Sequence, residues 1–167
     1  MKEIKKLSVL IFLIFLFCSI FYLLDKNEIL EIKHEGFKSF VYFGIIVFSL
    51  FSIFLNLFSF REIKLKLLFS ILPIFAFIEI LNFGMLRTIF CSSSWKTQNI
   101  IYQNKFDESK KVEFQMLDKG AIGYRRRTVE VNYITDWFFI SRPYTEEIYN
   151  PNWLKTEKEV NELKLKY

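Results

Sequence analysis

Three long apolar runs in the first 90 residues constrain this chain more than any other feature. The runs span about residues 7–24, 39–60 and 67–90, and the first two hold no charged side chain. About 20 apolar residues are enough for a helix to cross a hydrocarbon core roughly 30 Å thick. Lipid offers no partner to free backbone groups, so each run must be helical. The sequence therefore predicts a transmembrane bundle of three helices over residues 1–90.

The first run is predicted to be a membrane helix that stays on the protein. It is longer than the ~7–15 apolar residues of a secretory signal, and it lacks the small-residue cleavage pattern of one. Ser19 is followed by the bulky residues Ile20 and Phe21.

The basic residues in the loops predict the orientation. Residues 1–6 and 61–66 fall on one side of the bundle and together hold six Lys or Arg residues, whereas residues 25–38 hold three Lys and four acids. The positive-inside rule then places the amino terminus in the cytoplasm. Three spans leave the tail outside, periplasmic or extracellular. The Phe-, Ile-, Lys- and Asn-rich composition suggests a bacterial source and an inner-membrane location.

Residues 91–167 are predicted to form a small β-rich α+β extramembrane domain, because they hold 24 of the 41 charged residues and read as short strands. In residues 111–117, Val112, Phe114 and Met116 alternate with polar residues. Residues 127–135 alternate again, and period two marks a half-buried strand. Glycines 120 and 123 between these segments indicate a hairpin. Further strands are expected at 99–106 and 137–141, and a terminal helix at 153–166.

Polar residues inside the spans form the first candidate site. The acid Glu79 lies near the middle of the third span, where a charge is costly, so it should face protein or water. Asn82, one helical turn further on, extends this polar stripe. The Ser/Asn face of the second span and Ser19 of the first span could meet Glu79 in the bundle. Helix packing, a proton or cation relay, and a subunit contact are the three interpretations of this cluster. Its residues are Glu79, Asn82, Ser49, Ser52, Asn56 and Ser19.

A run of three arginines after the two glycines is the second candidate site. Arg125, Arg126 and Arg127 could contact an anion, a lipid headgroup or an acidic partner. On a strand they alternate faces, so one of them is expected to point inward. The alternative interpretation is a hairpin turn with a solvated strand.

Catalytic, metal and cofactor patterns are not evident in the sequence. Two cysteines and one histidine give neither a disulfide framework nor a metal-ligand pattern, and no nucleophile motif is present. The predicted function is that of a non-enzymatic integral membrane protein whose tail binds a protein partner or the membrane surface, as an accessory subunit or a toxin-immunity protein would. The alternative is a small transporter or channel component that uses Glu79. The expected partners are the lipid bilayer and another protein or a second copy, but not nucleic acid.

Overall fold

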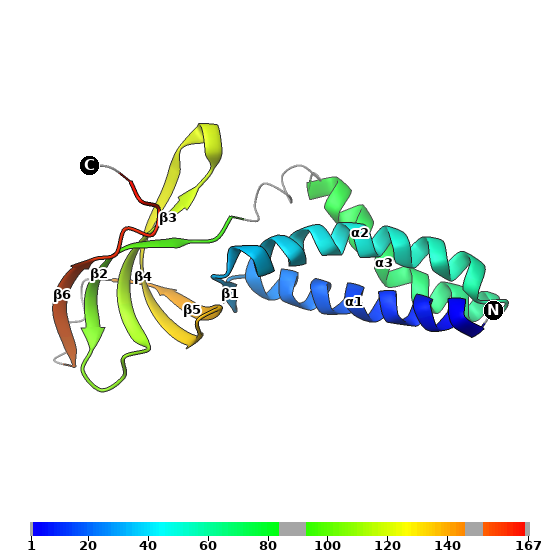
Figure 1. The fold of residues 1–167 in the computed structure, drawn as a ribbon, viewed down its shortest axis with the longest axis horizontal. Coiled ribbons are helices and arrows are strands. Elements are labelled where there is room, and N and C mark those ends of the chain that lie inside the picture. The colour runs from blue at the N-terminus through cyan, green and yellow to red at the C-terminus, as the bar shows by residue number, and fades with distance from the viewer. Residues whose placement is uncertain (1, 84–92, 146–151, 166–167) are drawn as a thin grey trace. The chain divides into compact units, whose positions relative to one another are not determined.

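The computed structural model describes residues 2–83, 93–145 and 152–165 of the chain (Figure 1). The chain divides into two compact units. The helical unit comprises Met1–Leu23 and Ser39–Ser92, and the sheet unit comprises Leu24–Lys38 and Ser93–Tyr167. The loop at residues 24–38 therefore belongs to the sheet unit. The sequence-based boundary at residue 90 places that loop with the membrane bundle and stays a prediction.

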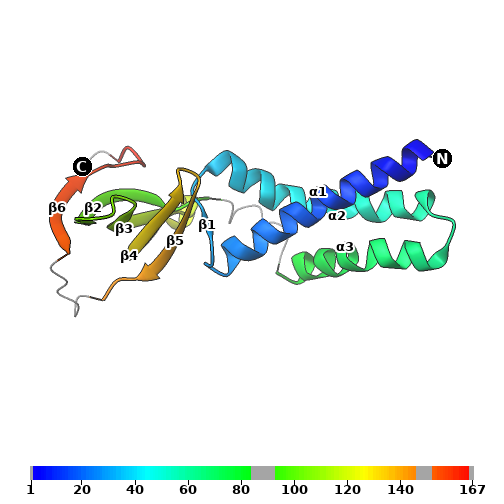
Figure 2. The same ribbon diagram turned by 90° about the horizontal axis from the view of Figure 1, so that it is seen from below.

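Within the described residues, the helical part of the chain has three helices: α1 (Lys2–Lys26), α2 (Glu35–Ser59) and α3 (Ile63–Phe83). Each begins several residues before its apolar run. Figure 2 shows these helices from below. Two of them, over Glu3–Lys26 and Glu35–Ser59, are long and apolar enough to span a membrane. Residues 84–90 of the third predicted span lie outside the described residues.

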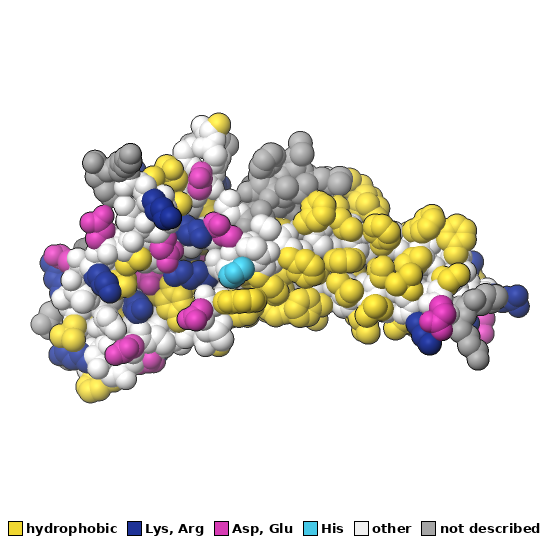
Figure 3. Space-filling model, in the orientation of Figure 1, with side chains coloured by type: hydrophobic (Ala, Val, Ile, Leu, Met, Phe, Trp, Pro, Cys, Tyr) yellow, Lys and Arg dark blue, Asp and Glu magenta, His cyan; other side chains and the backbone are white. Residues whose placement is uncertain are grey.

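The helices present apolar side chains on their outer surfaces (Figure 3). Only 22% of the most apolar stretch of α1 and 44% of that of α2 is buried. A core helix of a water-soluble protein buries most of its apolar residues, because exposed apolar area is unfavourable in water. Exposed residues such as Leu13, Phe54 and Leu72 on the three helices instead fit a lipid environment.

The sheet unit contains one antiparallel sheet of six strands in the order β1-β5-β4-β3-β2-β6. The predicted strands near 99–106, 111–117, 127–135 and 137–141 are all confirmed, with shifted ends. The strands are β1 (Glu31–Ile32), β2 (Lys96–Asn104), β3 (Lys110–Asp118), β4 (Tyr124–Thr135), β5 (Phe138–Pro143) and β6 (Trp153–Glu159). The chain thus combines apolar helices with a β-rich domain.

The predicted hairpin is formed by β3 and β4, which pair from Lys110↔Asn132 to Asp118↔Tyr124. A short 3-10 turn, Gly120–Ile122, connects them. Gly120 has φ +63° and Gly123 has φ +92°, and residues other than glycine rarely adopt these backbone angles. The two glycines are therefore required by the backbone of this turn.

The terminal helix predicted at residues 153–166 is wrong, because the segment begins with strand β6. Trp153–Glu159 pairs with the open edge of β2, for example Leu154↔Gln103 and Lys155↔Tyr102. The four-residue spacing between Lys155 and Glu159 suggested helical ion pairs. The unpaired edge of β2 outweighs that weak local preference, since strand formation depends strongly on tertiary context.

The loop between the first two helices contributes a strand to the sheet. Within residues 25–38, the chain forms a turn and then β1. This strand pairs with β5 through Glu31↔Phe139 and Ile32↔Phe138. Lys33 continues the contact by donating its backbone N–H to the carbonyl of Trp137 at 2.8 Å.

Candidate functional site

The predicted Ser/Asn face of the second span is buried within the helical unit. Ser49, Ser52 and Asn56 are fully buried. The Asn56 amide donates to the backbone carbonyl of Phe69 on α3 at 2.7 Å, and its oxygen accepts from the hydroxyl of Ser8 on α1 at 2.6 Å. Asn56 therefore links all three helices. The sequence prediction missed Ser8 as its partner.

Glu79 is not brought to this polar face. Its side chain and that of Asn82 are exposed on α3, whereas Ser49 is buried and donates its hydroxyl to the carbonyl of Ile46. Ser19 donates to the carbonyl of Phe15, one turn earlier on its own helix. The structure thus separates the predicted cluster into a buried Asn56 centre and an exposed Glu79.

In the sheet unit, the β3–β4 register sets which residues share a face. The alternation in residues 111–117 gives two faces but does not say which of them is buried. The register pairs Glu113 with Val129 and Gln115 with Arg127. Glu113 and Gln115 are 2% and 1% exposed. Strand β3 is therefore buried on both faces, and one of those faces is polar.

A buried ion pair lies at the centre of this polar face. The Arg127 guanidinium is 2.7 Å from a carboxylate oxygen of Glu31, and these side chains are 14% and 4% exposed. Arg127 also donates twice to Gln115, at 2.8 and 2.9 Å. Its guanidinium carbon lies 4.0 Å from the ring centre of Trp95, within the range of a cation–π contact. The hydroxyl of Ser141 donates to the other oxygen of Glu31.

The hydrogen-bond network of this polar face extends through Tyr133 to Glu113 and Lys33. Its hydroxyl donates to Glu113 at 3.1 Å and accepts from the ammonium of Lys33 at 2.8 Å, and Lys33 is 2.9 Å from Glu162. Burial and the nearby Glu113 charge raise the pKa of Tyr133 to about 12. Burial lowers the pKa of Lys33, but the Tyr133 and Glu162 contacts outweigh it and raise that pKa to about 12. Thr97 and Gln115 also donate to Glu113, at 2.7 and 2.9 Å.

These contacts decide the roles open to the three predicted arginines. Arg127 points inward, as one of the three was expected to do, and its donors are used within the protein. Arg125 and Arg126 are exposed on the strand. Arg127 is therefore separated from the other two arginines, and the network in which it takes part links β1 to the sheet.

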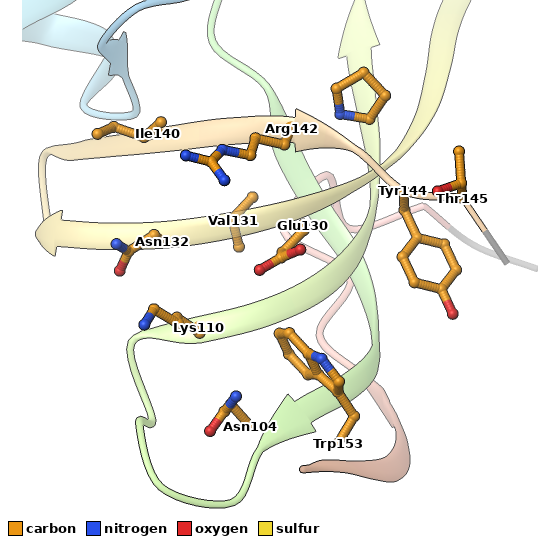
Figure 4. A pocket seen from close by; sticks show the side chains of 11 residues that line it. Asn104, Lys110, Glu130, Val131, Asn132, Ile140, Arg142, Tyr144, Thr145 and Trp153 are labelled. Atoms are coloured by element: carbon orange, nitrogen blue, oxygen red, sulfur yellow. The ribbon is translucent and has the colours of Figure 1, made fainter. Parts of the chain in front are cut away.

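The opposite face of the sheet carries a pocket of about 550 Å³, which the sequence did not reveal (Figure 4). This volume is within the range of ligand sites. Lys110, Asn132 and Ile140 form one cross-strand row in it, and Glu130 and Arg142 belong to the next. Other strands and loops complete the wall with Asn104, Pro143, Tyr144, Thr145 and Trp153.

The pocket has two chemically different ends. In Figure 4 the charged ends of Lys110 and Arg142 lie toward the turn between β4 and β5, and Tyr144 and Trp153 lie at the other end. Glu130 lies between them. The members of this pocket come from residues 104–153, and no local pattern in the sequence joins them.

Among the residues that the structure describes, no group of three or more His, Cys, Asp or Glu side chains could hold a metal ion. Comparison of the chain with models of protein families, with curated proteins and with solved structures gives no match. The class of the protein therefore rests on the fold. Two helices that could span a membrane and an antiparallel sheet domain define a membrane-associated α+β protein.

Proposed function

We propose that this chain is a non-enzymatic, membrane-anchored binding protein whose sheet domain recognises a protein partner through the pocket of Figure 4. One observation carries the proposal: Arg142, Tyr144 and Trp153 all line one pocket. Trp, Tyr and Arg are the residues that most often dominate the energy of protein interfaces. Arg142 and Trp153 lie on strands of the sheet, and side chains that are in place before binding lower the entropic cost of association.

Three membrane crossings are part of the proposal. Strand β1 lies between α1 and α2 in the chain, yet it pairs with β5 of the tail. The chain must therefore cross an even number of times between β1 and β2. If α2 crosses once, α3 must be the second crossing. Its 21 described residues give about 31 Å at 1.5 Å per residue, close to the thickness of the hydrocarbon core.

The basic loops support an orientation with the amino terminus in the cytoplasm and the sheet domain outside. A bacterial inner membrane is the proposed location. Cysteine accessibility tests it in a chain without Cys18 and Cys91. Single cysteines at the exposed positions Glu28 and Asp136 should both react with an impermeant thiol reagent in intact cells. A cysteine at Glu62 should react only after lysis. Labelling of the cysteine at position 28 but not of the cysteine at position 136 would contradict the proposal that both lie on the same side of the membrane.

In-cell photo-crosslinking tests the binding function. A photoreactive residue replaces Ile140, which lines the pocket and is 37% exposed, and in a control it replaces Ile134, which is 57% exposed and does not line it. We expect a discrete protein adduct from position 140 alone, and its loss when Trp153→Ala is added. Adducts with lipid only, or equal protein adducts from both positions, would contradict a protein-binding pocket.

The transporter alternative has no observation in its favour. Glu79 and Asn82 are exposed on α3 and are separated from the buried Ser49 and Asn56. A relay needs polar groups in sequence along one path, because a proton or cation moves between neighbouring partners.

A further inference from the structure

We infer that the pocket takes an acidic segment of its partner, with a carboxylate at the Lys110–Arg142 end and an apolar side chain against Trp153. This inference rests on the proposed function, since it specifies the chemistry of the partner bound at the same site. The basis is the set of hydrogen-bond donors in the pocket that remain available to a ligand.

Arg142 is the strongest such group. It is exposed, and within the described part of the chain its guanidinium makes neither an ion pair nor a hydrogen bond. A guanidinium presents a planar fork of donors that matches a carboxylate with two parallel hydrogen bonds. By contrast, the donors of Arg127 on the other face are used by Glu31 and Gln115.

Lys110 and Asn104 add donors near the same end. Lys110 lies 3.2 Å from Asp107, but both side chains are over 40% exposed, so this pair adds little stability and can yield to a ligand. The side-chain oxygen of Asn104 accepts from the backbone N–H groups of Phe106 and Asp107. Its amide nitrogen is the group that remains, and it can only donate.

Glu130 sets the type of anion that fits. Its carboxylate lies between the basic end and Trp153 (Figure 4). The negative charge of Glu130 repels a small, highly charged anion such as phosphate from the basic end of the pocket. A polypeptide offers the complement to both charges, because it carries a backbone N–H group for Glu130 within a few ångströms of its own acidic side chain. Its neighbouring apolar side chain can then pack on the indole of Trp153.

The test uses the full chain in membranes with the photoreactive residue at position 140. Arg142→Glu should lower the adduct yield at least tenfold, the size of a lost charge-assisted hydrogen bond. Arg142→Lys should keep most of the yield. Arg126→Glu is the matched control, because Arg126 is exposed on the same sheet outside the pocket, and it should leave the yield unchanged.

Mass spectrometry of the adduct then identifies the bound segment, which should hold Asp or Glu within a few residues of the cross-link. A synthetic peptide of that segment should bind the purified chain at least tenfold more tightly than its Asn or Gln analogue. Inorganic phosphate at equal ionic strength should not displace it better than chloride.

Retention of the adduct in Arg142→Glu, or a segment without an acid, would overturn the inference. If Trp153→Ala still abolished that adduct, the proposed function would stand. Displacement by phosphate alone would assign the site to a free anion and overturn the inference as well. Absence of any protein adduct at position 140 in the parent chain would instead reject the proposed function itself.

Discussion

The Arg127→Met variant tests whether the ion pair with Glu31 holds the first loop against the sheet. The substitution keeps much of the length of the side chain but removes its charge. Glu31 is then left as a buried carboxylate whose remaining side-chain donor is the hydroxyl of Ser141. Removing one partner of a buried pair costs ~3–5 kcal/mol. Gln115 also loses two donors, so we expect a loss of about 4 kcal/mol.

The assay is urea or thermal unfolding of the purified full chain in detergent micelles. Fluorescence of Trp95 is a suitable signal, since Arg127 lies on its ring. For a unit of this size, 4 kcal/mol corresponds to a fall in Tm of roughly 15–30 °C. Arg126→Met, one residue away on the same strand, is exposed and should change stability by less than about 0.5 kcal/mol.

A double-mutant cycle isolates the pair from the general effect of substitution. Replacing both charges, as in Glu31→Leu with Arg127→Met, should recover about 2 kcal/mol or more relative to the sum of the single variants. The reason is that no uncompensated buried charge remains. Additive losses, or a loss below about 1 kcal/mol for Arg127→Met alone, would refute the conclusion that this pair fastens β1.

Three further predictions concern pH, the helical unit and the hairpin. Lys33 and Tyr133 both have folded-state pKa values near 12, above their ordinary values of 10.5 and 10.0, so the folded state holds these protons more tightly. Their contribution to the free energy of unfolding should therefore be fully present below pH 10 and fall by on the order of 2 kcal/mol between pH 10 and 12. The fall should be smaller in Tyr133→Phe. Urea unfolding at each pH measures both. Asn56→Leu leaves a buried hydroxyl and a carbonyl without their partner and should cost about 0.5–2 kcal/mol in detergent unfolding, whereas Leu57→Ile on the exposed face should cost less. Gly123→Ala forces a side chain into φ +92° and should cost about 1–3 kcal/mol of thermal stability, a loss that Ala121→Gly in the same turn should not reproduce.

Local patterns predicted those parts of the fold that depend on neighbouring residues. The β3–β4 hairpin follows from two alternating segments and two glycines within 26 residues of sequence. The apolar runs likewise mark the helices without any knowledge of their partners. Each of these signals lies within one segment or two adjacent ones, so the sequence alone was sufficient.

Long-range pairing decided what could not be predicted. The burial of Glu113 did not follow from the sequence, because alternation gives two faces but does not say which of them is buried. Its partners Thr97 and Tyr133 lie 16 and 20 residues away. The segment at 153–159 had weak helical spacing and became β6 because β2 offered an open edge. The pocket depends on these same pairings, so its residues could not be collected from the sequence.

Strand β5 connects the loop of the first two helices with the proposed binding pocket. Phe138 and Phe139 pair with β1, and the next residues on the same strand, Ile140 and Arg142, line the pocket on the opposite face from Glu31. Glu31 finds its ion partner only after 96 further residues have been added to the chain. In the proposed three-span arrangement, the sheet can be completed only when the tail reaches the same side of the membrane as the first loop. A chain whose third helix fails to cross would leave Glu31 without Arg127, and β5 would lose the strand that covers its edge. The pocket is thus expected to form fully only in chains that have reached the three-span arrangement.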